Sequence, residues 1–297
     1  MERIGELAAF SAAAAMSTGA LFFERGIKHI GVLSVNFIKV VVAFILLTIT
    51  ATITRGMPLP IDASNHALLL LSISGIIGFL ITDMFLFSVY ATVGPRIAML
   101  FMALSPPVTA GIAYIFLGET IGPRGGIGMA LVITGIFIVV FARQGSMSFL
   151  KINSKDRLGY IFGVIACIGQ SVGMVLTKAG IGDYDPISGT QIRIFAAVIG
   201  YAIVSFIYKR GEGIKKAIRS KEGLKFTLAG SVFGPFLGVF LSLYALQRIS
   251  TGIVSTLMGL APIVIIVPEI LIFKKKIKPL EIFGALVAVA GTTIFFT

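Results

Sequence analysis

The sequence lacks most of the residues on which metal binding, redox chemistry and nucleotide hydrolysis depend. Among 297 residues there is one cysteine, Cys167, which excludes an intramolecular disulfide and a CxxC redox pair. The two histidines, His29 and His66, fall near expected loops, and no HExxH or other metal-ligand spacing occurs. No Walker-type loop is present to cradle the phosphates of ATP. We therefore expect no catalytic residues, no metal site and no cofactor.

Charge is also scarce. Charged residues make up 13% of the chain and hydrophobic residues 57%, with a mean hydropathy of +1.00, whereas soluble domains carry about 25% charged residues. The apolar residues form blocks of roughly 20, the length that crosses about 30 Å of hydrocarbon as a helix. The alternation typical of a membrane barrel is absent from the sequence. The pattern predicts an all-α integral membrane protein, because helices satisfy their own backbone groups.

We expect ten transmembrane helices. The first apolar block could be taken for a signal peptide, but its leading MERIGE is not a basic segment and the block recurs later, so we expect it to be retained. The expected helices lie at approximately residues 5–23, 33–54, 67–90, 97–118, 123–142, 158–180, 186–208, 224–247, 251–273 and 279–296.

The chain contains an internal repeat. We divide it into a first repeat, residues 1–143, a basic linker, residues 144–157, and a second repeat, residues 158–297. Each repeat holds five expected helices, an odd number, so the second enters the membrane from the opposite face. Inverted repeats of this kind are typical of secondary transporters. At offsets of 154 and then 156 residues, the matched pairs include Ser17 with Ser171, Gly19 with Gly173, Tyr90 with Tyr244, Pro106 with Pro262, Gly128 with Gly284, and Gly135 with Gly291.

Two segments carry a family resemblance. They are YIFLGETIGPRGGIGMALVITGIFIVV in the first repeat and ILIFKKKIKPLEIFGALVAVAGTTIFF in the second. They resemble the two copies of the EamA repeat, in which an LGE turn ends the fourth helix and a fifth helix with spaced glycines follows. The second copy departs from this pattern, reading FKKKIKP where the first reads LGETIGP. The resemblance covers essentially the whole chain and implies the drug/metabolite transporter superfamily, with ten helices around a central cavity.

The resemblance also implies movement of small metabolites, often amino acids and commonly outward. We therefore expect a secondary transporter that exports a small organic metabolite, an amino acid or a related compound, by alternating access. Fold alone does not prove function. A passive membrane channel or scaffold is the alternative, and an intramembrane enzyme is a remote one, since no nucleophile with a His or Lys base is visible.

Asp83 is a carboxylate within the apolar run FLITDMFLF, residues 79–87. An ionisable group inside a membrane is costly without a partner and is by default a functional candidate. The second repeat has Leu237 at the matching place, so the needs of a symmetric scaffold explain Asp83 poorly. Two interpretations are open. Asp83 either faces the central cavity, where it pairs with a cation or carries a coupling proton, or it forms a structural ion pair. Tyr90 shares its helical face.

Lys39 and Arg193 are basic residues at matching places in the second helix of each repeat, where EamA repeats often carry a basic residue. They either recognise a carboxylate or other anionic group of the substrate, with Asn36 and Gln191 close by in the sequence, or snorkel to the headgroups from positions near the helix ends. Gln170 either lines the cavity or bonds to a neighbouring helix.

These considerations give two sets of candidate residues. Paired prolines in corresponding helices indicate hinges, because proline removes a backbone donor, although tolerated packing is an alternative. The substrate-binding candidates are Asp83, Lys39, Arg193, Asn36, Gln191, Tyr90, Tyr244 and Gln170, and the hinge candidates are Pro106, Pro107, Pro262, Gly234 and Pro235.

Basic residues are unevenly divided between the two sides of the expected membrane. Of the 25 Lys and Arg, two (Lys39 and Arg193) lie inside helices, 5 lie on the side of the amino terminus and 18 on the opposite side. The positive-inside rule places the basic-rich side in the cytoplasm and both termini outside, whereas the family expectation places both termini inside. The net charge is +12, and we expect the basic loops that carry it to contact anionic lipid. We expect no nucleic-acid partner.

The expected location is therefore the plasma membrane, which the chain crosses many times as a monomer or homodimer. The expected partners are the lipid bilayer, a small-molecule substrate and either a coupling proton or an exchange substrate.

Overall fold

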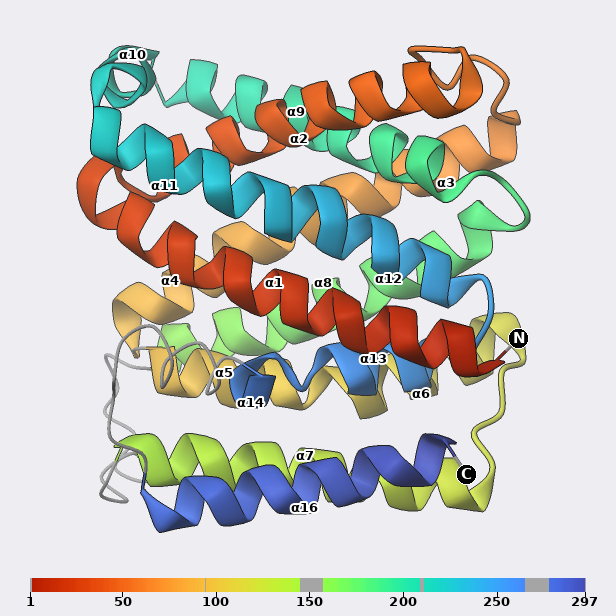
Figure 1. Ribbon diagram of the computed structural model, residues 1–297. Coiled ribbons are helices and arrows are strands. Elements are labelled where there is room, and N and C mark those ends of the chain that lie inside the picture. Colours follow the sequence, from red (N-terminus) through yellow and green to blue (C-terminus); the bar gives the residue numbers. More distant parts are fainter. Residues whose placement is uncertain (1, 94, 145–156, 209–210, 265–277, 297) are drawn as a thin grey trace.

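The computed structural model describes residues 2–93, 95–144, 157–208, 211–264 and 278–296. Within these ranges the chain forms helices joined by short connections, and no strand is present. Most helices run between two opposite ends of the molecule and lie side by side in a bundle (Figure 1). The expected all-α class is confirmed for the described ranges.

The first repeat opens with two long uninterrupted helices, continues with two helices built of shorter pieces, and ends with a fifth helix that is again uninterrupted. Its third expected helix consists of three consecutive segments, of which the middle one is a π-helix. The elements are α1 (Glu2–Ile30), α2 (Val32–Arg55), α3 (Asn65–Gly75), η1 (Ile76–Ile81), α4 (Thr82–Thr92), α5 (Pro95–Ala103), α6 (Ser105–Leu117) and α7 (Pro123–Gln144).

The second repeat follows the same order with one added short helix, α10. Its third long helix is also interrupted by a π-helix. The elements are α8 (Arg157–Ile181), α9 (Pro186–Ile207), α10 (Gly211–Arg219), α11 (Lys221–Ser231), η3 (Val232–Gly238), α12 (Val239–Leu246), α13 (Thr251–Met258), α14 (Ala261–Val264) and α16 (Pro279–Phe296).

Local sequence signals set where several helices begin and end. The Ser64 hydroxyl accepts the Ala67 N–H at 3.1 Å at the start of α3, and the Asp185 carboxylate accepts the Ser188 N–H at 2.8 Å at the start of α9. Each acceptor satisfies a donor that the first helical turn leaves without a partner. Gly56 ends α2 with a left-handed backbone at φ 70°, a conformation that glycine adopts without steric cost.

Within the described residues, seven helical segments are long and apolar enough to cross a membrane. Two shorter apolar helices, Ser105–Leu117 and Pro279–Ile294, accompany them. The ninth expected helix, 251–273, extends beyond the described residues, so the count of ten stays a prediction. The findings establish a multi-pass membrane protein. The seven segments are Arg3–Ile30, Val32–Arg55, Asn65–Leu86, Pro123–Ala142, Arg157–Ile181, Pro186–Ile207 and Lys221–Leu246.

Two local features differ from the expected helices. The fourth expected helix is interrupted at Leu104, just before Pro106 and Pro107, because these two residues cannot donate to a preceding turn. Residues 211–219, which fall between the expected helices 186–208 and 224–247, form the helix α10. Its Ala217 is only 3% exposed while Lys216 points to solvent, an amphipathic pattern too short for a hydropathy window to detect.

The two repeats run in opposite directions, as α7 and α16 show (Figure 1). A methyl group added at Gly135 would lie 2.5 Å from the Gly284 carbonyl oxygen, and one added at Gly291 would lie 2.8 Å from the Gly128 carbonyl oxygen. The internal alignment matches Gly128 with Gly284 and Gly135 with Gly291, so the two contacts exchange when the repeats are exchanged. This reciprocity is what a pair of inverted repeats requires, and small residues let the backbones approach.

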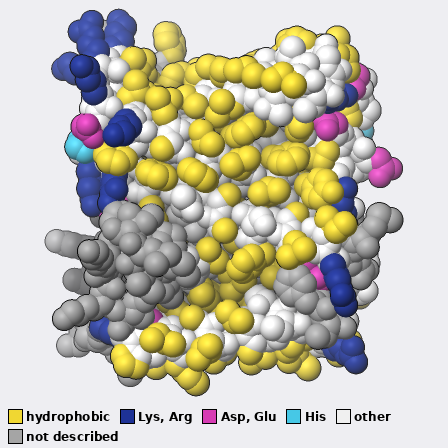
Figure 2. All heavy atoms as spheres, viewed as in Figure 1, with side chains coloured by type: hydrophobic (Ala, Val, Ile, Leu, Met, Phe, Trp, Pro, Cys, Tyr) yellow, Lys and Arg dark blue, Asp and Glu magenta, His cyan; other side chains and the backbone are white. Residues whose placement is uncertain are grey.

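Apolar side chains cover much of the outer surface. Figure 2 shows hydrophobic side chains across the middle of the visible face, with Lys and Arg gathered towards its left and right edges. Phe206 is 85% exposed and Ile53 78% exposed. An apolar surface of this extent on the outside of long helices is suited to contact with lipid acyl chains.

The two ends of the bundle differ. Both chain ends lie at one of them, on the right in Figure 1, together with the connections 56–64, 118–122, 182–185 and 247–250, and we call this end the terminal face. The opposite end carries α10 and the start of α11, with Lys215, Lys216, Arg219 and Lys221, and we call it the basic face.

Candidate substrate site

A cavity of ≈ 290 Å³ lies inside the bundle between the two repeats. Segments α1, α2, η1 and α4 of the first repeat and α8, α9, η3, α12 and α13 of the second contribute to its wall. Pockets for small molecules measure about 300–1,000 Å³, so the cavity is of a size for a small metabolite. Most of its lining is apolar. The polar side chains in the wall are Lys39, Asp83, Gln170, Thr177, Arg193 and Ser242.

Both π-helices belong to the cavity wall. Gly78 and Phe79 come from η1, and Gly234 and Pro235 from η3. At the offsets of the internal alignment, η1 and η3 occupy overlapping places in the two repeats. A π-bulge alters the regular backbone bonding, and the Phe79 carbonyl accepts the Tyr201 hydroxyl at 2.7 Å. The sequence therefore interrupts the same helix in both repeats, next to the cavity.

Each π-helix packs against the first helix of the other repeat through glycine. A methyl group added at Gly19 of α1 would lie 2.8 Å from the Gly234 nitrogen, and one added at Gly173 of α8 would lie 3.3 Å from the Gly78 Cα. Gly19 and Gly173 are a matched pair in the alignment. These reciprocal contacts bring the repeats together at the level of the cavity.

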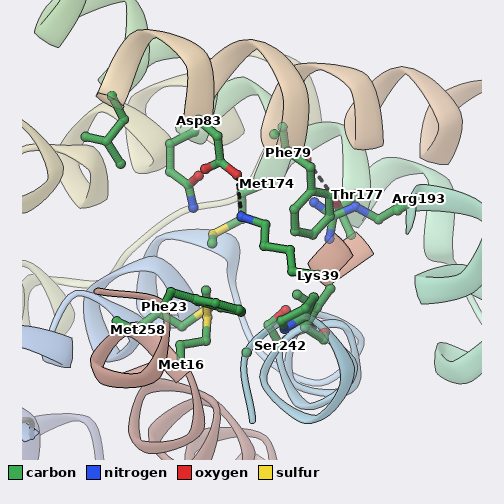
Figure 3. A pocket seen from close by; sticks show the side chains of 18 of the residues that line it. Met16, Phe23, Lys39, Phe79, Asp83, Met174, Thr177, Arg193, Ser242 and Met258 are labelled. Atoms are coloured by element: carbon green, nitrogen blue, oxygen red, sulfur yellow. Dashed lines mark hydrogen bonds and ion pairs between the residues drawn. The ribbon is translucent and has the colours of Figure 1, made fainter. Parts of the chain in front are cut away.

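Lys39 and Asp83 form an ion pair in the cavity wall. The Lys39 ammonium nitrogen lies 2.8 Å from Asp83 Oδ2, and the two side chains are 12% and 19% exposed (Figure 3). The same ammonium lies 5.6 Å from the centroid of the Phe23 ring, within the range of a cation–π contact. The two intramembrane charges of the first repeat, which the sequence analysis treated separately, therefore neutralise each other.

Arg193 occupies the matching place in the second repeat but has a different environment. It is 8% exposed, and its guanidinium carbon lies 5.1 Å from the centroid of the Phe79 ring (Figure 3). Its Nε is buried and has no hydrogen-bond partner. Leu237 stands where the first repeat has Asp83, so the second repeat supplies no carboxylate at this place.

The other polar candidates divide between the cavity and its surroundings. Gln170 lines the cavity. Asn36 is buried in α2 and is not among the lining residues. The Gln191 amide donates to Thr48 Oγ1 at 2.9 Å and to the Pro58 carbonyl at 2.7 Å, so it links α9 to the first repeat outside the cavity.

Of the two tyrosine candidates, only the Tyr244 side chain belongs to the described residues, and it is not among those that line the cavity. Tyr244 packs in α12 under Arg248, whose guanidinium carbon lies 3.4 Å from the ring centroid. Tyr90 belongs to α4, but its side chain lies outside the described residues.

Of the hinge candidates, Gly234 and Pro235 lie in η3 on the cavity wall. Pro106 and Pro107 begin α6 next to the interruption at Leu104, so they end one helical segment and start another. The side chain of Pro262, in α14, lies outside the described residues.

Sequence reasoning missed the apolar part of the site. Met16, Met174 and Met258 line the cavity together with Phe23 and Leu86. No signal in a single sequence separates these residues from lipid-facing or core residues of the same types. Among the described residues, no group of three His, Cys, Asp or Glu side chains comes together as a metal site would need.

A first polar network links the two repeats at the terminal face. Arg55 at the end of α2 contacts Asp62 at 2.5 Å, donates to the Ser188 hydroxyl, and lies 3.8 Å from Asp185. The Tyr184 hydroxyl donates to Asp62 at 2.9 Å. The hydrogen bond from Arg55 holds the pKa of the Asp62 carboxyl below its usual range, while burial and the bond to Asp62 raise the pKa of Tyr184.

A second network joins the same face. Glu119, from the LGE turn after α6, accepts the Thr251 N–H at 2.6 Å at the start of α13. Lys178 of α8 lies 3.8 Å from Glu119 and donates to the Leu246 and Ile249 carbonyls. Each network contains residues of both repeats, so both networks link the repeats at the terminal face. We call the two networks together the terminal latch.

The arrangement defines a class: a multi-pass helical membrane protein whose two inverted repeats enclose a cavity with charged side chains. The model of the EamA-like transporter family matches residues 3–141 and 157–297, and the chain belongs to this family. A solved structure titled "Crystal structure of protein" is similar in fold, with a TM-score of 0.79 and 16% sequence identity over 99% of this chain and 96% of that one. No curated protein sequence matches the chain.

Proposed function

We propose that the protein is a secondary transporter that carries a small organic metabolite through the central cavity by alternating access. The observation that carries the proposal is the cavity between inverted repeats, with Lys39, Asp83 and Arg193 in its wall. Intramembrane charges are retained where they have a function, and inverted-repeat transporters bind substrate between their repeats. Membership in a transporter family supports the same conclusion.

The repeats rock about the cavity in this proposal. The terminal latch breaks when the terminal face opens, and the close glycine contacts on either side of the cavity act as pivots. The π-helices η1 and η3 absorb the change, because a helix that already departs from regular bonding bends there at low cost. Gly234 and Pro235 then act as hinge residues.

Asp83 is proposed to carry the coupling proton. Protonation of its carboxyl releases the Lys39 ammonium, and ionisation restores the 2.8 Å pair, so the proton changes the charge of the cavity wall. Asp83→Asn should abolish uphill transport driven by a proton gradient and spare exchange of substrate down its own gradient. Proton-driven uphill transport at the wild-type level in Asp83→Asn would remove Asp83 from the coupling and leave an exchange substrate as the driving species.

Because relatives in the family commonly export metabolites, we propose export from the cytoplasm across the plasma membrane. Because basic residues gather on the cytoplasmic side of membrane proteins, we propose that the basic face is cytoplasmic. A reporter enzyme that is active only outside the cell should work when fused after residue 296 and fail when inserted at Lys216. The reverse result would place both termini inside. We propose a monomer as the functional unit, because the described lining residues form the cavity within a single copy of the chain.

Counterflow in liposomes tests transport itself. Amino acids, sugars and organic acids are first screened for thermal stabilisation of the purified protein, because a ligand of the native state raises its apparent stability. The stabilising compound is then loaded inside proteoliposomes, and uptake of labelled compound from outside is measured. A transporter takes up label saturably and faster with a loaded interior. Uptake without saturation or stimulation from the opposite side would indicate a channel, and no uptake a scaffold.

A further inference from the structure

The charges in the cavity wall do not balance. Lys39 and Asp83 pair at 2.8 Å and neutralise each other. Arg193 adds one positive charge, and in the described part of the chain it has neither an ion pair nor a hydrogen bond from its side chain, only the ring of Phe79. A guanidinium is always ionised in proteins, and a buried charge without a paired partner is costly. The cavity therefore lacks one negative charge.

The repeat relationship shows what is missing. In the first repeat, the cation of the second helix is satisfied by Asp83 in the third. In the second repeat, Arg193 matches Lys39 but Leu237 replaces the carboxylate. A fold that needed only neutral scaffolding would keep both partners or remove both. Retaining the cation alone, 8% exposed and in the cavity wall, leaves a place for an anionic group from outside the chain.

We propose that Arg193 binds the carboxylate of the transported metabolite, and that this metabolite is a small organic anion of net charge −1 with an apolar body. The proposal rests on the proposed transport function and names the substrate class of the same site. Carboxylate matches the planar fork of a guanidinium, which offers two parallel N–H donors.

The rest of the wall selects for charge and polarity. A phosphate monoester carries about −1.5 to −2 near neutral pH and would leave excess negative charge next to Asp83. A zwitterionic amino acid carries no net charge and would leave the positive charge of Arg193 unbalanced. The lining methionines Met16, Met174 and Met258 offer adaptable apolar contacts for the body of the ligand. A monocarboxylate with an apolar body supplies the single negative charge and suits the apolar lining.

Binding to the purified protein in lipid nanodiscs tests the proposal with matched probes. One set is 4-methylpentanoate, its amide 4-methylpentanamide, and leucine, which adds an ammonium group to the same skeleton. The second set is 3-phenylpropanoate, its amide, and phenylalanine. We expect the carboxylate to bind most tightly in at least one set, with the amide about 10- to 150-fold weaker, as the loss of a charge-assisted hydrogen bond predicts.

Variants then assign the effect to Arg193. Arg193→Gln should weaken carboxylate binding by about 10- to 150-fold and leave amide binding unchanged, and Arg193→Lys should recover only part of the loss because it keeps the charge without the fork. Lys28→Gln is the matched control, because Lys28 is an exposed cation outside the cavity, paired with Glu24 at 3.0 Å. It should leave all affinities unchanged.

A structural role for Arg193 is distinguished by stability. A cation kept for a ligand is a cost to the empty protein, so Arg193→Met should raise the thermal unfolding temperature or leave it unchanged. A clear fall would mean that the guanidinium stabilises the fold, and it would overturn the proposal. Unchanged carboxylate affinity in Arg193→Gln, equal or tighter binding of amides or amino acids, or no carboxylate binding in either set would also overturn it.

Counterflow separates this inference from the transport proposal. If an amide or an amino acid exchanges saturably while carboxylates do not, transport stands and the substrate class is wrong. If a carboxylate binds through Arg193 but is not exchanged, the binding site stands and transport is wrong.

Discussion

The Lys39 ammonium nitrogen lies 2.8 Å from Asp83 Oδ2, so a lysine of α2 and an aspartate of α4 form a charge pair on the wall of a cavity inside the bundle. The pair is largely removed from water, and each partner offsets the desolvation of the other. Such a pair adds little stability compared with apolar residues of the same volume, yet losing one partner is costly. This asymmetry makes the pair suited to a wall that changes its charge during function.

A double-mutant cycle measures how strongly the two residues are coupled. Asp83→Asn leaves the Lys39 ammonium without its partner. Breaking a buried pair costs about 3–5 kcal/mol, and contact with the cavity reduces this, so we expect about 1–3 kcal/mol in the free energy of unfolding. Combining Asp83→Asn with Lys39→Met should recover most of the loss, because no charge is then left without its partner. Additive effects of the two single substitutions would show that the contact contributes nothing.

The glycine contact between α7 and α16 gives a second prediction. Gly135→Ala places a methyl group 2.5 Å from the Gly284 carbonyl oxygen and should destabilise the protein by about 1–3 kcal/mol, as overpacking does. Gly126→Ala, in the same helix, meets nothing within 4 Å and should be neutral or stabilising by up to about 1 kcal/mol, because alanine favours helix. Thermal unfolding in detergent compares the two. Equal effects would contradict the reciprocal packing.

The terminal latch predicts a pH dependence with a definite sign. Arg55 lowers the pKa of Asp62 below its unfolded value of about 3.9. The stabilisation by Asp62 is therefore fully present above pH of about 4 and is lost as the pH falls through the lower folded-state pKa. The difference in unfolding temperature between wild type and Asp62→Asn should be constant from pH 5 to 7 and shrink below about pH 4. A difference that is the same at pH 3 and pH 6 would show that the pair is not coupled to titration.

The sequence predicted the order of the helices better than the places where their backbone departs from a regular α-helix. Block length and the glycine matches indicated inverted repeats, and the contacts of Gly135 and Gly291 follow that alignment. The π-helices were not predicted, because one extra residue in a helical turn leaves the apolar pattern almost unchanged. Proline indicated two of the interruptions, η3 at Pro235 and the break before Pro106, but no proline lies in η1.

Site residues were harder to predict because the rotation of each helix about its axis decides which side chains meet. The sequence left open that Asp83 pairs with a cation but did not identify Lys39 as its partner, and the structure shows this pair. Gln191, two residues from Arg193, turns away from the cavity to bond with the first repeat. The latch residues Arg55 and Glu119 lie at helix ends. Polar residues are expected there, but the sequence does not show which residues they contact.

Alternating access around the cavity is tested most directly by sided thiol labelling. Ser242→Cys in a Cys167→Ala background places one thiol in the cavity wall, where Ser242 is 5% exposed. In oriented proteoliposomes, a membrane-impermeant maleimide is added from one face at a time, with and without Arg55→Gln, which weakens the terminal latch.

Alternating access predicts that the labelling rates from the two faces change in opposite directions. Arg55→Gln should raise labelling of the Ser242→Cys thiol from the terminal face and lower it from the basic face, because the cavity opens to one side at the expense of the other. Labelling that rises from both faces together, or that occurs from neither, would contradict alternating access through this cavity.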